Sequence, residues 1–179
     1  MRRLNLDQLK KGQPGISESA GLFLSEAGAY CLMKNGHQRG VELYISGVKE
    51  EKLKVYWSQV LTEQMRKTWG DGEEATEYGA MGIAVLLVLK LTKYKILGRL
   101  VKGDRTDYLL GNEKDSNNPV AKMEVSGILK ADSNNSINKR VGIKKRQVGK
   151  IKDRAYPVYI AVTEFGQPAV KFLIYESRN

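Results

Sequence analysis

The spacing of hydrophobic and polar residues along the chain predicts an α/β protein. Four stretches carry apolar residues at helical spacing, and seven shorter ones show the alternation or the short apolar runs typical of strands. The predicted helices span 18–34, 59–68, 73–92 and 136–153, and the predicted strands span 41–45, 53–57, 94–101, 106–110, 120–129, 157–164 and 169–175. We therefore expect a central mixed β-sheet flanked by helices.

Breaks rich in glycine, proline and polar residues divide the chain into three parts. Residues 1–15 are mostly polar and contain two glycines and a proline, so we expect a flexible N-terminal arm. Residues 16–70 predict a helix, a hairpin and a second helix capped by Ser58, which form an α+β extension packed on the core. Residues 71–179 form the core, in which the polar stretch 111–119 is expected to be a loop.

An excess of basic residues points to a polyanionic partner. The chain has 30 Lys and Arg against 20 Asp and Glu, a formal net charge of +10, which favours nucleic acid, DNA ahead of RNA. Positive charge is dense on one face of the predicted helix 136–153, although an ordinary solvated helix face is the alternative. Gln147 could support the site or contact a phosphate, but a surface position is favoured. The residues expected to contact the phosphate backbone are Lys139, Arg140, Lys145, Arg146 and Lys150.

Several classes of protein are disfavoured by residues that the chain has only once or lacks. Cys31 is the single cysteine and His37 the single histidine, which excludes an intrachain disulfide and a cysteine zinc site and disfavours Ser-His catalysis. The start of the chain has no apolar secretory segment, and Lys90 interrupts the longest apolar run. We therefore expect a cytoplasmic protein that does not bind membranes.

Two acidic residues lie in apolar stretches predicted to form neighbouring strands. Asp107 opens the segment DYLLG, and Glu124 lies inside AKMEVSG. Burying a carboxylate costs free energy unless a cation meets it, so this pair indicates a shared cation. Each acid also has a structural explanation: Asp107 could fix the preceding turn through its side chain, and Glu124 could pair with Lys122 or with a lysine of the last helix.

The predicted helix 73–92 begins with acidic residues and ends in a wholly apolar segment. The apolar half predicts burial, and Gly79 and Gly82 would let the helix approach a strand closely. Acids in the first turn suit the positive end of the helix dipole. Glu77 is the acid of interest, because alanine and leucine residues continue its face of the helix.

The order of elements from residue 73, with these acids in it, resembles the PD-(D/E)XK nuclease superfamily, and in particular an uncharacterised bacterial branch. The shared core is αβββαβ, with an acidic helix, an Asp on the second strand and (Asp/Glu)-X-Lys on the third. The resemblance covers about residues 73–176 and implies a restriction-endonuclease-like core that hydrolyses nucleic acid with Mg²⁺ or Mn²⁺. It also implies that Asp107 and Glu124 are metal ligands, with Glu77 as the helix acid and the Val125 carbonyl as a further ligand.

The chain departs from that pattern at one position, where Ser126 follows Glu124-Val125 in place of a lysine. Such a lysine would orient the attacking water and stabilise developing negative charge. Candidate replacements are Lys122 on the same strand face, Lys144 or Lys145 on the next helix and, less favoured, Lys102 at the hairpin turn. The candidate catalytic set is Asp107, Glu124, Lys122, Ser126 and Lys144.

The missing lysine leaves a second function open. If no lysine reaches the site, the chain is a catalytically inactive nuclease-fold protein that binds nucleic acid or assembles with other proteins. A homodimer is compatible with either function.

Overall fold

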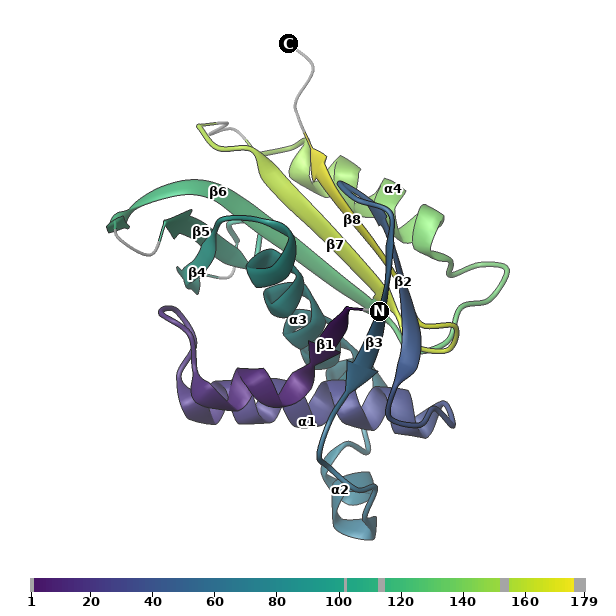
Figure 1. The fold of residues 1–179 in the computed structure, drawn as a ribbon. Helices are drawn as coiled ribbons and strands as arrows, with labels where there is room; N and C mark the ends of the chain where they lie inside the picture. Colours follow the sequence, from purple (N-terminus) through teal and green to yellow (C-terminus); the bar gives the residue numbers. More distant parts are fainter. Residues whose placement is uncertain (1, 102, 113–114, 152–154, 176–179) are drawn as a thin grey trace.

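A single mixed β-sheet runs through the whole molecule and carries helices on both faces (Figure 1). The computed structural model describes residues 2–101, 103–112, 115–151 and 155–175. The sheet has eight strands in the order β1-β3-β2-β8-β7-β6-β5-β4. The helices are η1 (Leu6–Lys11, a 3₁₀ helix), α1 (Glu18–Lys34), α2 (Glu63–Thr68), α3 (Gly72–Leu91) and α4 (Ile137–Val148). The strands are β1 (Arg3–Asn5), β2 (Val41–Gly47), β3 (Glu51–Tyr56), β4 (Lys95–Arg99), β5 (Tyr108–Asn112), β6 (Asp115–Ile128), β7 (Val158–Glu164) and β8 (Ala169–Tyr175).

The predicted α/β class and the mixed sheet flanked by helices are confirmed. From α3 onward the elements follow the predicted order of helix, three strands, helix and two strands. Strands β4, β5 and β6 form an antiparallel meander, β6 and β7 pair in parallel across α4, and β8 returns antiparallel to β7. No helix within the described ranges has the length and apolar character that crossing a membrane requires.

The N-terminal residues differ from the expected flexible arm. Strand β1 pairs in parallel with β3, and η1 follows it directly. Leu4, Leu6 and Leu9 are buried in the main core, at exposed fractions of 2% or less. Their burial is favourable enough to fix a segment whose overall polarity suggested a linker.

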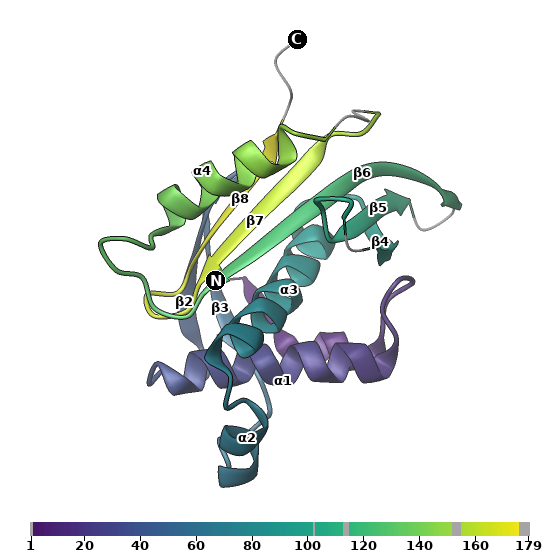
Figure 2. The same cartoon turned by 180° about the vertical axis from the view of Figure 1, so that it is seen from behind.

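The hairpin β2–β3 belongs to the same sheet as the core strands. Strand β2 pairs in parallel with β8, from Tyr44 opposite Ala169 to Gly47 opposite Phe172. The sheet therefore crosses the boundary expected near residue 70. Seen from behind, α1 and α3 lie together on one face of the sheet and α4 lies alone on the other (Figure 2).

Two local predictions are wrong, one at the start of a helix and one in a segment expected to be a loop. The helix expected at 59–68 begins only at Glu63, where Thr62 accepts a hydrogen bond from the Met65 amide. Ser58, the expected cap, instead donates to Asp7 and accepts from Lys10 at η1. The loop expected at 111–119 is mostly strand, since β5 reaches residue 112 and β6 starts at residue 115. Its polar side chains hid the pairing, which is irregular there.

Close contacts at glycines set the packing of α3. Gly79 and Gly82 were expected to admit a strand, but they face α1: a β-carbon would lie 3.2 Å from the Ala27 carbonyl oxygen at Gly79 and 3.0 Å from that of Leu24 at Gly82. The close approach to a strand comes from Gly127 on β6, where a β-carbon would overlap the carbonyl oxygen of Thr76 on α3. Gly127 therefore determines how closely α3 lies on β6.

We expect Gly127→Ala to lower the free energy of unfolding by about 2 kcal/mol, because α3 must move away from β6 to admit the methyl group. Urea unfolding measures the loss. Gly98→Ala in β4 is the matched control, since a β-carbon there meets no atom within 4 Å. Equal stability of the two variants would show that the α3–β6 contact is not tight.

Candidate active site

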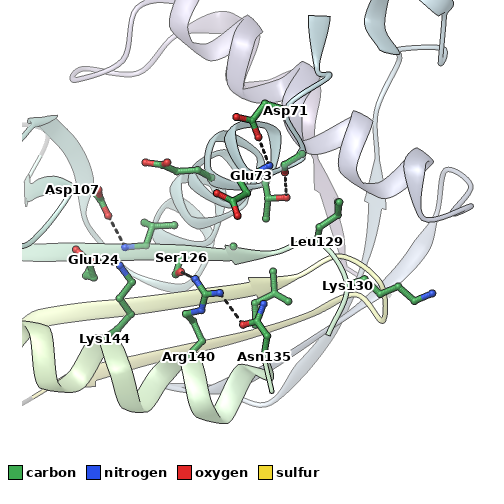
Figure 3. A pocket seen from close by; sticks show the side chains of 16 residues that line it. Asp71, Glu73, Asp107, Glu124, Ser126, Leu129, Lys130, Asn135, Arg140 and Lys144 are labelled. Atoms are coloured by element: carbon green, nitrogen blue, oxygen red, sulfur yellow. Dashed lines mark hydrogen bonds and ion pairs between the residues drawn. The ribbon is translucent and has the colours of Figure 1, made fainter. Parts of the chain in front are cut away.

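A cavity opens where β6 loses one of its neighbours. Strand β7 pairs with β6 from Lys122 to Ile128, whereas β5 pairs with it only as far as Met123. Beyond Met123 the edge of β6 that faces away from β7 lies between α3 and α4. The cavity at this edge has a volume of about 640 Å³, and its walls come from the first turns of α3, from β6 and the segment after it, and from α4 (Figure 3).

Asp107 lies at this open edge, one residue before β5 begins. Its backbone amide donates to the Met123 carbonyl oxygen over 2.8 Å, and its Oδ2 accepts from the Val125 amide over 2.7 Å. The register that pairs Tyr108 with Met123 places Asp107 beside Glu124 in the next position. The Asp107 side chain thus bonds to β6, not to the turn that precedes it.

Glu124 is buried and held by two residues of α4. The residue is 3% exposed, and its Oε1 accepts from Lys144 Nζ at 2.5 Å and from Gln147 Nε2 at 3.0 Å. Lys144 rises from α4 toward β6 to reach it (Figure 3). The pairing of Glu124 with a lysine of the last helix, which was the structural explanation offered for this acid, is therefore present. That pairing does not exclude a chemical role, because the carboxylate also lines the cavity.

Burial and neighbouring negative charge disfavour the ionised form of both carboxylates. Burial raises the pKa of Glu124 to about 7, with a further contribution from the Asp107 charge, while Lys144 and Gln147 act in the opposite direction. Burial also raises the pKa of Asp107, against the effects of the Val125 amide, Lys144 and Arg99. A cation between the carboxylates would relieve both effects, so the pair has the electrostatic character of a cation site.

The structure brings most of the predicted site residues together. The cavity is lined by Glu77, Asp107, Glu124, Ser126, Arg140 and Lys144, among others. Of the candidate lysines, Lys144 contacts Glu124, whereas Lys122 does not line the cavity and Lys145 lines a separate one. Lys102 lies outside the described residues.

The carboxylates fit a divalent cation in a two-ligand arrangement. Within the described residues, Asp107 Oδ1 and Glu124 Oε2 accept no hydrogen bond, so each acid keeps one oxygen for a ligand. Magnesium is commonly held by one or two carboxylates together with waters and substrate phosphates. No group of three acidic, histidine or cysteine side chains in the described ranges is close enough to hold a metal ion. Glu77 is exposed on the α3 wall of the same cavity, where its charge contributes to the raised pKa of Asp107, but it does not complete a three-residue group with the other two acids.

Two residues have different positions from those expected. Gln147 was placed at the surface, but it is half-buried and its Nε2 donates to Glu124 and, over 3.3 Å, to the Arg105 carbonyl. Arg140 was assigned to an exposed face, but it donates to Ser126 Oγ over 3.3 Å and to Asn135 Oδ1 over 2.8 Å. Positions 140, 144 and 147 are four and three apart, so helical periodicity could have placed them on one face.

The site therefore combines an acid pair with two cations. Lys144 and Arg140 come from one side of α4 and reach β6 at Glu124 and Ser126 (Figure 3). Such a set can bind a divalent cation and an anionic substrate together. No protein-family model, curated protein or solved structure matches the chain. The interpretation of this cavity as a candidate active site therefore rests on the chemistry of its residues.

The raised pKa of Glu124 predicts a characteristic pH dependence of stability. The native state keeps the Glu124 proton at pH values where the unfolded chain, at its ordinary value of 4.5, has lost it. The free energy of unfolding should therefore fall as pH rises from about 4.5 to 7, by up to about 3 kcal/mol from this residue. Glu124→Gln should remove that part of the pH dependence in urea titrations with EDTA. Glu63→Gln, which removes an exposed carboxylate of α2, is the control and should keep the wild-type slope. An unchanged slope in Glu124→Gln would contradict the assignment.

Proposed function

We propose that this chain is a metal-dependent nuclease of the PD-(D/E)XK type in which a lysine of α4 takes the place of the lysine missing after Glu124. The observation that carries the proposal is the contact between Lys144 Nζ and Glu124 Oε1, at the cavity that Asp107 shares. Lys144 then supplies from the helix the positive charge that Ser126 cannot supply from the strand. Asp107 and Glu124 are the proposed ligands of Mg²⁺ or Mn²⁺.

The element order supports a restriction-endonuclease-like core. Helix α3, the meander β4–β5–β6, helix α4 and strand β7 follow one another as αβββαβ. Glu124 lies on the third strand, and Asp107 lies one residue before the second strand, where the resemblance expects an Asp on the strand. The proposed metal ligands are the two carboxylates of Asp107 and Glu124, while Glu77 lines the same cavity. This set is compatible with a single ion held by two carboxylates and the substrate.

Each residue of the site has a proposed part in phosphodiester hydrolysis. A bound divalent cation would neutralise charge on the phosphate and make a bound water more acidic. The Val125 amide and the Gln147 side chain orient the two carboxylates through the oxygens that face away from the ligand. Lys144, whose side chain is 18% exposed, lies close enough to the acid pair to stabilise developing negative charge. Ser126 acts as a positioning residue that holds Arg140 toward the substrate phosphate.

The basic charge of the chain supports nucleic acid as the substrate. The net charge is +10, and α4 carries exposed Lys139, Lys145 and Arg146 besides the two cations of the site. Phosphate groups are the ligands that such cations bind without regard to sequence. DNA is the proposed substrate ahead of RNA.

One observation favours a second function, a nuclease-like fold that binds nucleic acid without cutting it. Lys144 already neutralises Glu124, so the buried carboxylate does not require a metal ion for its stability. In that case the chain binds nucleic acid through its cations and no divalent ion occupies the acid pair. Isothermal titration with Mn²⁺ separates the two functions.

Lys144→Met should lower the rate of cleavage by about 10² to 10³, because it removes the cation beside the reacting phosphate. Lys122→Met is the matched control, because Lys122 lies on β6 near Glu124 but does not line the cavity. This variant should cleave at a rate close to that of the unchanged protein. The assay follows labelled single-stranded DNA, duplex DNA and RNA with Mg²⁺ or Mn²⁺. Asp107→Asn and Glu124→Gln should abolish cleavage and weaken binding of Mn²⁺.

The same experiments can refute the proposal. If the unchanged protein cuts none of these substrates, and if Asp107→Asn and the unchanged protein bind Mn²⁺ with the same affinity, the acid pair is not a metal site. Equal loss of activity in the Lys122 and Lys144 variants would show that the contact with Glu124 is not what matters. Circular dichroism of each variant checks that it is folded.

A further inference from the structure

A second cavity lies beside the last turns of α4 and is lined by basic residues. Its volume is about 680 Å³. We propose that this cavity is a phosphate-binding subsite that holds a nucleotide of the substrate strand next to the one at the acid pair. The choice of a nucleic-acid strand as its ligand rests on the proposed function. The polar residues that line the cavity are Arg105, Lys145, Arg146, Gln147, Lys150 and Tyr175.

The charge of the cavity calls for an anion. Four of its lining residues are cationic, and none of the described residues that line it is acidic. All four cations are exposed, and none makes an ion pair with an acid of the described ranges. Like charges gathered around one hollow repel each other, so binding an anion there is favourable. Phosphate groups carry the charge and the acceptor oxygens that lysine and arginine bind best.

Arg105 holds an unusual backbone conformation at this cavity. Its φ of 60° is the only positive φ at a non-glycine residue in the described part of the chain. A left-handed conformation of this kind is unfavourable for a residue with a side chain and persists where surrounding contacts fix it. Here the Arg105 carbonyl accepts a hydrogen bond from Gln147 on α4. The turn before β5 is thus tied to α4 at the point where both line the cavity.

Gln147 also joins this cavity to the acid pair. Its Nε2 donates to Glu124 Oε1 at 3.0 Å and to the Arg105 carbonyl at 3.3 Å, so one side chain lies between the two sites. A strand with one phosphate at Asp107 and Glu124 can therefore place a neighbouring phosphate among the cations. The volume exceeds what a phosphate ion needs and is in the range of pockets that hold small organic ligands. Tyr175 offers a ring against which a sugar or a base can pack.

The test compares two pairs of cations that occupy the same kind of position. Lys145 and Arg146 lie in the last turn of α4, and Arg66 and Lys67 lie in the last turn of α2. Each double alanine variant of the full chain removes two charges. Binding of a fluorescent oligonucleotide is measured in EDTA at several salt concentrations. We expect K145A/R146A to weaken binding about tenfold and to reduce the slope of log Kd against log salt by about 0.7 to 0.9 per lost phosphate contact. R66A/K67A should bind like the unchanged protein.

If K145A/R146A and R66A/K67A weaken oligonucleotide binding equally, binding depends on overall charge, and the proposal of a subsite is overturned. Arg105→Ala should weaken binding as well, whereas Arg105→Lys should restore part of it. Competition with inorganic phosphate decides the ligand: we expect millimolar phosphate to displace the oligonucleotide poorly, and efficient displacement would mean a site for free phosphate instead.

The binding assay contains no metal, so its outcome is independent of cleavage. If the chain cuts nothing but still distinguishes the two pairs, the nuclease proposal fails and the subsite stands. If the chain cuts nucleic acid and both pairs behave alike, the subsite fails and the nuclease proposal stands. Where cleavage is observed, K145A/R146A should raise KM and leave kcat nearly unchanged, because the subsite contacts strand that does not react.

Discussion

The buried carboxylate of Glu124 is the constraint on which the site depends. A carboxylate that is 3% exposed on a central strand is tolerated only with a cation or with several hydrogen bonds. Lys144 and Gln147 of α4 meet that need. They can do so because Val141 and Val148 fix the helix against Ile160 and Val162 of β7 in a small separate core. The rotation of α4 that buries Val141 and Val148 is therefore the same one that brings Lys144 and Gln147 to Glu124.

The open edge of β6 gives Asp107 a structural partner and also brings it beside Glu124. Because β5 begins only at Tyr108, opposite Met123, the Val125 amide has no partner in that strand, and Asp107 supplies a carboxylate oxygen in place of a backbone carbonyl. This brings two carboxylates together in partly buried surroundings, and burial raises the pKa of both. A neutral acceptor at position 107 would bond to the same amide without the cost of a second buried charge, so the charge of Asp107 is the feature that the proposed cation site accounts for.

How much of this could be predicted from sequence depends on the range of the interactions involved. Periodicity alone gave the order of elements from α3 to β8, since each pattern is local. It also placed Asp107 and Glu124 on neighbouring strands. The lysine partner could not be chosen in this way: strand alternation puts Lys122 on the face of Glu124, but only the packing of α4 brings Lys144 to it. The prediction of a flexible arm at residues 1–15 is wrong for a related reason: Leu4 is buried through pairing of β1 with β3, which is far away in sequence.

Helix α4 has two faces that serve different parts of the same surface. Arg140, Lys144 and Gln147 reach β6 or the acids, while Lys145 and Arg146 line the second cavity with Arg105. Successive residues of a helix are about 100° apart, so a slip of one position would turn Arg140, Lys144 and Gln147 away from β6. Gln147 bonds to Glu124 on one side and to the Arg105 carbonyl on the other, and so links both cavities to the helix rotation that the apolar packing of α4 sets. The positions of the acid pair and of the basic cavity are therefore not independent: any ligand that spans them meets a geometry set by the packing of α4 and by the two bonds of Gln147.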